Sequence, residues 1–150
     1  TRFDITELIA GVIQSASIMA AQKKVDRQFY KDGPVYVWGD EFKVEEVITN
    51  YLTNAMNHAD GQRRIEIRFS YHDGLVRTSV FNTGEPIPEE DLEKIWVKFY
   101  KVDKARTREY GGSGIGLSIV KAVMDSFHQK CGVINHENGV EFWMGLASNN

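Results

Sequence analysis

Apolar residues recur every three or four positions in three stretches of the chain, which is the spacing of one face of a helix. The first stretch begins at an N-cap, Asp4 or Thr6, and ends near Lys23. The second follows the N-cap Asp40, and the third begins at Ser113 after a run of glycines. We therefore expect three amphipathic helices, each with one buried face.

Shorter stretches, in which apolar and polar residues alternate, predict strands. The predicted strands are residues 27–30, 35–38, 64–71, 75–82, 133–136 and 140–146. Turn residues such as Asp73-Gly74 and Asn138-Gly139 separate the members of each pair, so we expect the strands to pair as hairpins. The result is a mixed, mostly antiparallel sheet covered on one face by helices, which is an α+β fold arranged as a two-layer α/β sandwich.

Composition narrows the classes of function. The chain of 150 residues is 42% hydrophobic and 26% charged, as expected for one globular domain, and its formal net charge is −3. Its single cysteine excludes an internal disulfide and a multi-thiolate metal site. The mild acidity argues against a nucleic-acid binder that works through bulk charge. No apolar run approaches the roughly 20 residues that span a bilayer.

The second predicted helix carries an unusual polar face. Glu46, Asn50 and Asn54 follow one another at four-residue spacing and share that face, and Asn57 lies just beyond them. Asparagine is a mediocre helix former, so its repetition needs a reason. Its amide oxygen is a hard ligand suited to Mg²⁺, which takes few protein ligands and keeps several waters. The cluster indicates a magnesium site, and a solvated polar face is the alternative.

Two further segments combine glycine with polar chemistry. Residues 111–117 read Gly-Gly-Ser-Gly-Ile-Gly-Leu at the start of the third helix, after five basic residues within the segment 98–112. A glycine-rich helix N-terminus lets backbone N–H groups approach a polyphosphate, although a flexible surface loop is the alternative. The glycine spacing fits neither the Rossmann nor the P-loop pattern. At a predicted strand end, Asn82 precedes Gly84 and could read the edge of a planar base, or form an ordinary turn.

Taken together and in this order, the motifs resemble those of the catalytic ATP-binding domain of bacterial two-component sensor histidine kinases. These kinases belong to the GHKL superfamily, with gyrase, Hsp90 and MutL. Residues 50–58 resemble the N box, 82–87 the G1 box, 95–103 the F box and 112–117 the G2 box. The four boxes occur in the right order, and the resemblance covers nearly the whole chain.

The resemblance implies a single catalytic domain over residues 1–150, with the Bergerat ATPase fold and an ATP lid at about 98–112. Asn54 would hold Mg²⁺, with Asn50 as its neighbour or second ligand, and Asn82 would accept a hydrogen bond from the adenine amino group. The positions implied in nucleotide binding are Asn50, Asn54, Asn57, His58, Asn82, Gly84, Ile87, Tyr100, Lys101, Gly112, Ser113, Gly114, Ile115, Gly116 and Leu117.

The chain departs from the family pattern at some of these positions. Asn82 stands where the G1 box usually has Asp, and Pro86 replaces the usual second glycine. Asn57 and His58 occupy the end of the N box, where a basic residue and an aromatic residue are common. Because Asn82 keeps a carbonyl acceptor but carries no charge, we expect adenine recognition to persist in a weaker form.

The activity that the resemblance implies is one half of a kinase reaction, namely ATP binding and donation of the phosphate. The domain would bind Mg-ATP and donate the γ-phosphate to a histidine on a separate helical dimerisation domain. His58, His72, His128 and His136 do not match the phosphoacceptor motif, and no catalytic residue is assigned. The implied partners are the dimerisation domain and a response regulator, and the isolated domain is expected to be monomeric. The resemblance also implies a cytoplasmic domain, whose parent protein is often anchored in the plasma membrane.

Two alternatives stay open. One is a degenerate GHKL domain that senses nucleotide or binds partners without turning ATP over, and the departures at Asn57, Asn82 and Pro86 favour it. The other is a GHKL Ser/Thr kinase or ATPase module. Such modules carry a catalytic carboxylate one turn before the metal-binding asparagine, and that position here is Asn50.

Overall fold

The computed structural model describes residues 1–98, 100 and 116–148. Its helices and strands, in chain order, are β1 (Arg2–Asp4), α1 (Ile5–Ser15), α2 (Ser17–Lys23), β2 (Asp26–Phe29), β3 (Tyr36–Trp38), α3 (Glu41–His58), β4 (Arg64–His72), β5 (Leu75–Thr83), the 3₁₀ turns η1 (Glu89–Asp91) and η2 (Lys94–Trp96), α5 (Gly116–Ser126), β6 (Cys131–His136) and β7 (Gly139–Ala147). The predicted helix start at Ser113 lies outside the described residues, within which α5 begins at Gly116.

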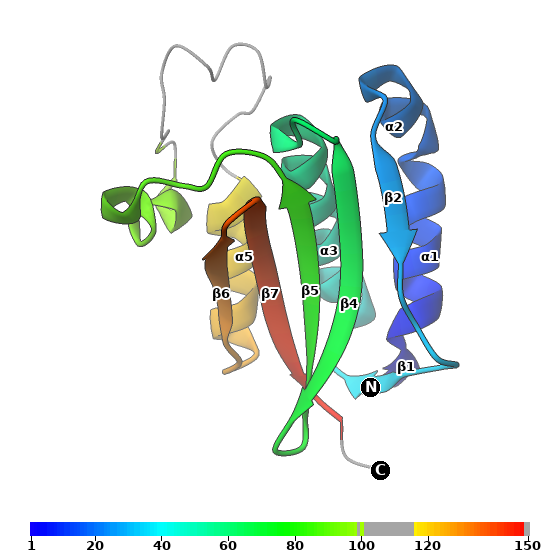
Figure 1. Ribbon diagram of the computed structural model, residues 1–150. Coiled ribbons are helices and arrows are strands. Elements are labelled where there is room, and N and C mark those ends of the chain that lie inside the picture. Colours follow the sequence, from blue (N-terminus) through cyan, green and yellow to red (C-terminus); the bar gives the residue numbers. More distant parts are fainter. Residues whose placement is uncertain (99, 101–115, 149–150) are drawn as a thin grey trace.

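Among the described residues, five strands form one sheet in the order β2-β4-β5-β7-β6, and β1 and β3 form a separate two-stranded sheet. Neighbouring strands of the large sheet run antiparallel, except that β2 runs parallel to β4. Figure 1 shows α1, α3 and α5 together on one face of the large sheet. The predicted two-layer α+β sandwich is therefore confirmed.

The first two predicted strands do not form the expected hairpin. β2 pairs in parallel with β4, with Arg27 opposite Ile65, whereas β3 pairs with β1, with Val37 opposite Phe3. The prediction that these strands pair with each other was wrong, and the three residues of β1 were not predicted as a strand. Such short strands carry too few alternating positions to identify a partner, because the partner is chosen by the packing of the whole sheet.

The first predicted helix is broken at Ala16 into α1 and α2. In a continuous helix the Ile13 carbonyl would accept a hydrogen bond from the N–H of Ser17, four residues further on. It instead accepts from the Ala16 N–H at 3.2 Å and from Arg27 Nη1, so a side chain from β2 takes part in the break at this turn. Within the described residues, no single helix is long and apolar enough to cross a membrane. In the part of the chain that the structure describes, α1 and α2 taken together, bent by 53°, are the one pair that reaches that length and composition.

Both predicted aspartate N-caps are confirmed. The Asp4 carboxylate accepts a hydrogen bond from the Thr6 N–H at 2.9 Å at the start of α1. At the start of α3, the Asp40 carboxylate accepts from the N–H groups of Phe42 and Lys43 at 3.0 and 3.3 Å. These bonds satisfy backbone donors that have no partner inside the first helical turn.

Helix α3 is central in the helical layer, because it packs against α1 on one side and α5 on the other. Its apolar stripe is buried and consists of Val44, Val47, Ile48, Tyr51, Leu52, Ala55 and Met56. The Tyr51 hydroxyl reaches the sheet and donates a hydrogen bond to the Trp143 carbonyl at 2.8 Å. This stripe fixes the rotation of α3 about its axis, and so the direction of the polar face that carries Asn50 and Asn54.

The two longer predicted hairpins, β4–β5 and β6–β7, are confirmed. Near the end of β5, Asn82 lies opposite Ile65 of β4 and opposite Val140 of β7. A β-carbon at Gly139 would lie 2.1 Å from the Asn82 carbonyl oxygen, so only glycine fits there. This close contact between β7 and β5 sets the point at which the chain leaves the sheet after Thr83.

Candidate functional site

The polar face of α3 lies where sequence periodicity placed it, with Asn50, Asn54 and Asn57 half-buried and His58 exposed. The side-chain amide of Asn50 donates to the Glu46 carbonyl at 2.9 Å. Within the described residues, no hydrogen bond engages the side chain of Asn54. The Asn54 amide is therefore available to a ligand, whereas the nitrogen of Asn50 is already occupied.

At the end of β5, Asn82 is only 2% exposed, and its Nδ2 donates to the Thr83 carbonyl at 3.1 Å. The Thr83 hydroxyl donates to the Asp60 carbonyl at 2.9 Å and accepts from the Arg64 N–H, also at 2.9 Å. The Asp60 N–H in turn donates to the Thr83 carbonyl at 2.9 Å. These bonds join the end of β5 to the segment that follows α3, so Asn82 and the N-box helix keep a fixed relation.

The loop after β5 presses against the C-terminal end of α3. Gly84 has a φ of +148°, and a β-carbon there would lie 2.9 Å from the His58 carbonyl oxygen. Only glycine combines this backbone conformation with so close a contact. The predicted G1 and N boxes are thus in direct main-chain contact.

Ile87 is held by a residue that the sequence prediction missed. The side-chain oxygen of Asn135, on β6, accepts from the Ile87 N–H at 3.0 Å, and its Nδ2 donates to the Ile87 carbonyl at 2.7 Å. Figure 1 shows the loop leaving the end of β5 and crossing toward the β6 side of the sheet. The one available signal was an asparagine inside a predicted strand, where this residue type is uncommon.

At the other side of the site, α5 begins against α3. A β-carbon at Gly116 would lie 3.0 Å from the Asn50 side-chain oxygen, so the start of α5 and the predicted metal-binding face are adjacent. Leu117 follows in the first turn and is half-buried. Free N–H groups and the positive end of the dipole make a helix start favourable for anions. The remaining predicted positions of the glycine segment, Gly112 to Ile115, lie outside the described residues.

Tyr100 has a partner that the prediction did not foresee. Its hydroxyl donates a hydrogen bond to the carboxylate of Asp91, a residue of η1 that is only 8% exposed. This hydrogen bond raises the pKa of Tyr100 above its ordinary value, because removing the proton would break it. Tyr100 is thereby tied to η1, and Lys101 lies outside the described residues.

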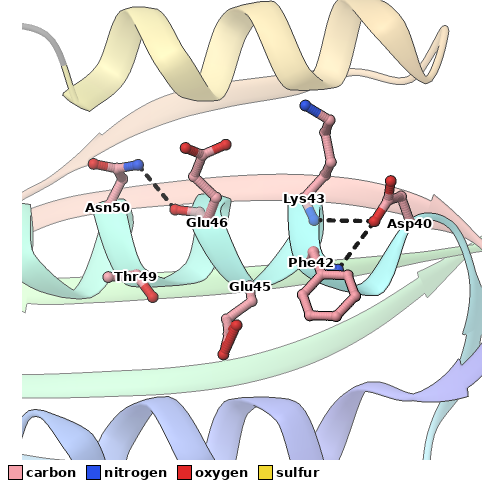
Figure 2. Close-up of a pocket in the computed structure, with 7 residues that line it drawn as sticks. All are labelled: Asp40, Phe42, Lys43, Glu45, Glu46, Thr49 and Asn50. Atoms are coloured by element: carbon pink, nitrogen blue, oxygen red, sulfur yellow. Dashed lines mark hydrogen bonds between the residues drawn. The ribbon is translucent and has the colours of Figure 1, made fainter.

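A separate cleft of about 460 Å³ lies on the outer face of α3 (Figure 2). Its lining residues are Asp40, Phe42, Lys43, Glu45, Glu46, Thr49 and Asn50. Among them, Glu46 and Asn50 belong to the predicted polar face of α3, and Asn50 alone is one of the positions implied in nucleotide binding. The carboxylates of Asp40, Glu45 and Glu46 would repel phosphate groups. This cleft is therefore not the site that the asparagine and glycine motifs predict.

A family model described as "Histidine kinase-, DNA gyrase B-, and HSP90-like ATPase" matches residues 39–149. The chain belongs to this family. Its curated relatives include the sensor histidine kinase CusS of Escherichia coli O157:H7, 31% identical over 139 residues, which are 93% of this chain and 29% of CusS. WalK of Bacillus subtilis (strain 168) is 37% identical over 97 residues, which are 63% of this chain and 16% of WalK. The chain thus spans less than a third of the length of these kinases.

Solved structures of histidine kinases share the fold of this ATPase-family chain. The catalytic domain of histidine kinase ThkA gives a TM-score of 0.86 at 30% identity, covering 99% of this chain and 95% of that one. ShkA in complex with AMPPNP gives 0.82 at 25% identity, covering 99% and 31%. ThkA in complex with the response regulator TrrA gives 0.79 at 29% identity, covering 99% and 42%. The predicted resemblance to histidine kinase catalytic domains is confirmed.

Proposed function

We propose that the chain is the catalytic domain of a longer sensor histidine kinase, which binds Mg-ATP and presents the γ-phosphate to a histidine on a separate helical dimerisation domain. The observation that carries the proposal is the convergence of two elements on the C-terminal half of α3. The loop after β5 meets it at His58, and the start of α5 meets it at Asn50. The family match over residues 39–149 and the AMPPNP complex of ShkA support the same interpretation.

Adenine would bind beside Asn82. Since Nδ2 of Asn82 donates to the Thr83 carbonyl, Oδ1 is the atom left to accept from the adenine amino group. Aspartate, the usual residue here, would turn a carboxylate oxygen toward that carbonyl, so the amide suits this backbone. Ile87 would form an apolar wall against the base. Gly84 has no β-carbon, so the loop can lie against the C-terminal end of α3 and would close the adenine pocket on that side.

The residues present also fit Mg²⁺. Within the described residues, no group of three or more His, Cys, Asp or Glu side chains could hold a metal ion. An amide oxygen is a hard ligand, and it suits an ion that takes most of its ligands from phosphate and water. Asn54 would be the protein ligand and Asn50 its neighbour, because the Asn50 oxygen faces Gly116. When bound, Mg²⁺ would neutralise charge on the phosphate oxygens.

The chain's own contribution to phosphoryl transfer would be positioning and charge neutralisation. The start of α5 would direct backbone N–H groups toward the phosphates, as the ends of helices do for anions. The acceptor histidine would come from the dimerisation domain, and the phosphate would pass on to a response regulator, the partner seen with ThkA. We further propose that this domain is cytoplasmic and monomeric when isolated, within a parent protein anchored in the plasma membrane.

Calorimetric titration of ADP and AMPPNP, with and without Mg²⁺, tests the binding step. Replacement of Asn54 by Ala should weaken Mg²⁺-dependent affinity at least about tenfold, because the ion loses its protein ligand. Thr49→Ala is the matched control, since Thr49 is exposed on the same helix and the change also raises helix propensity. Unchanged Mg²⁺-dependent affinity in Asn54→Ala would contradict the metal assignment.

A second assay separates kinase from ATPase. The chain is mixed with a helical dimerisation domain that carries a phosphoacceptor histidine, and both phosphohistidine and free phosphate are measured. We expect transfer to histidine with little hydrolysis, because Asn50 stands where ATPase modules carry a carboxylate. Rapid release of phosphate without phosphohistidine would favour the ATPase alternative, and binding without either product would favour the degenerate domain.

A further inference from the structure

The Asn135 side chain joins β6 to the loop after β5 through both backbone groups of one residue. Its oxygen accepts from the Ile87 N–H at 3.0 Å, and its Nδ2 donates to the Ile87 carbonyl at 2.7 Å. A single amide side chain thus forms the pair of bonds that a neighbouring strand would form through its backbone. The two residues are 48 positions apart in the chain, so the contact is tertiary rather than local.

The loop itself has few means of holding this position. Pro86 and Pro88 flank Ile87, and proline has no N–H, so Ile87 offers the one backbone donor among the three residues. Both prolines are exposed and Ile87 is half-buried. The Asn135 amide therefore takes up the donor that the prolines leave, together with the carbonyl of the same residue.

A second hydrogen bond ties the same loop to the same hairpin. The Gly84 N–H donates to the Asn138 carbonyl at 3.0 Å, in the turn between β6 and β7. This bond uses the backbone of Asn138, whereas the bonds to Ile87 use the side chain of Asn135. The chain therefore offers two asparagines on one hairpin, of which only one acts through its amide on this loop.

We propose that Asn135 is a positioning residue for nucleobase recognition, which holds Ile87 at the distance from Asn82 that the base requires. This inference rests on the proposed nucleotide-binding function. Loss of the amide would let the loop of residues 84–88 shift, and the base would then lose its apolar wall. The triphosphate end would be unaffected, because α5 and Asn54 hold it from the other side of α3. The base would also lie less closely against Oδ1 of Asn82, so the signature of Asn135 is a reduced preference for a base that carries an amino group.

The test compares ADP with inosine diphosphate, which carries an oxygen in place of the adenine amino group, by calorimetry in the presence of Mg²⁺. The unmodified chain should prefer ADP. Asn135→Ala should weaken ADP binding by about tenfold, because a loop that is no longer held in place must be ordered when the base binds. It should also reduce the preference for ADP over inosine diphosphate. Asn138→Ala, the matched control, should leave both affinities within about twofold, because its bond is made by the backbone.

Asn135→Asp serves as a second variant, in case Asn135→Ala does not fold. It retains an acceptor for the Ile87 N–H but sets a carboxylate oxygen against the Ile87 carbonyl, so it should weaken ADP binding in the same direction. Unchanged selectivity in folded Asn135 variants would overturn the inference, even with a lowered melting temperature. Equal binding of the two nucleotides by the unmodified chain would overturn both this inference and the role of Asn82. Absence of any nucleotide binding would overturn the proposed function itself.

Discussion

Two glycines bring other parts of the chain against α3, and they do so in different ways. A β-carbon at Gly84 would meet the backbone carbonyl oxygen of His58 at 2.9 Å, while one at Gly116 would meet the side-chain oxygen of Asn50 at 3.0 Å. The distances are nearly equal, yet the obstacles differ. The His58 carbonyl belongs to the backbone at the end of α3, two residues before Asp60, which is hydrogen-bonded to Thr83, whereas the Asn50 side chain can rotate.

The difference separates a rigid side of the proposed site from an adjustable one. On the base side, Gly84 meets α3 through a main-chain contact, so this position tolerates almost no change in residue type. The phosphate side is set by a side chain against a helix start, so it can yield by a few tenths of an ångström. Such a division suits a site in which the base is held in one fixed position and the phosphates are bound through charge.

The largest effect is expected for Gly84→Ala. The new β-carbon meets a fixed carbonyl, and alanine is strained at a φ of +148°, so the free energy of unfolding should fall by about 2–4 kcal/mol. Urea denaturation measures it. Gly61→Ala is the control, since Gly61 has a φ of +64° with nothing within 4 Å of the added carbon, and it should cost only about 1 kcal/mol. Equal losses of unfolding free energy in the two variants would show that the contact with His58 does not contribute to the effect of Gly84→Ala.

A smaller effect, which depends on its neighbour, is expected for Gly116→Ala. In the unmodified chain it should lower the free energy of unfolding by no more than about 1 kcal/mol, because the Asn50 side chain can move aside. In an Asn50→Ala background the same change should instead stabilise, since alanine is the better helix former. A double-mutant cycle in urea should give a coupling of at least about 0.5 kcal/mol. Strict additivity would mean that the two residues do not restrain each other.

The smallest effect, opposite in sign, is expected for Gly11→Ala in α1. An added β-carbon there has nothing within 4 Å and the residue is exposed inside a helix, so the change should raise the free energy of unfolding by about 0.5–1 kcal/mol. Thermal and urea unfolding check the value. The three positions then compare three surroundings of the added β-carbon: open space at Gly11, a side chain at Gly116 and a backbone carbonyl at Gly84. A loss of stability in Gly11→Ala would contradict this comparison, because Gly11 is the position at which no contact opposes the added carbon.

Several elements could be predicted because their signals are local. The apolar stripe of α3 recurs at helical spacing and Asp40 caps it, so both its extent and its buried face follow from consecutive residues. Likewise, apolar and polar residues alternate in β4 and β5 on either side of Asp73-Gly74. A short turn of this kind brings the two flanking strands side by side, so their pairing follows from local sequence. The break at Ala16 could not be predicted in this way, because one donor that takes part in it is Arg27 on another element.

The candidate site shows the same contrast between local signals and contacts made by distant elements. The roles proposed for Asn54 and for the glycine segment were predicted from residue type and spacing. In contrast, the pairing of Tyr100 with Asp91 and the contact of Asn135 with Ile87 depend on how the loop after β5 folds back over the sheet. The sequence marks Asn135 as an asparagine inside a predicted strand, but it does not indicate which residue either Asn135 or Tyr100 contacts.

The sequence by itself determined which residues turn inward and which residue types are available for phosphate, metal and base, because period and chemistry are properties of neighbouring positions. Only the tertiary structure decided that β2 joins β4 in parallel, that Gly84 and Gly116 meet α3, and that Asn135 holds Ile87. Those outcomes depend on which surfaces fit when the helices pack on the sheet. Residues distant in sequence come together there through the shape and burial of the whole domain.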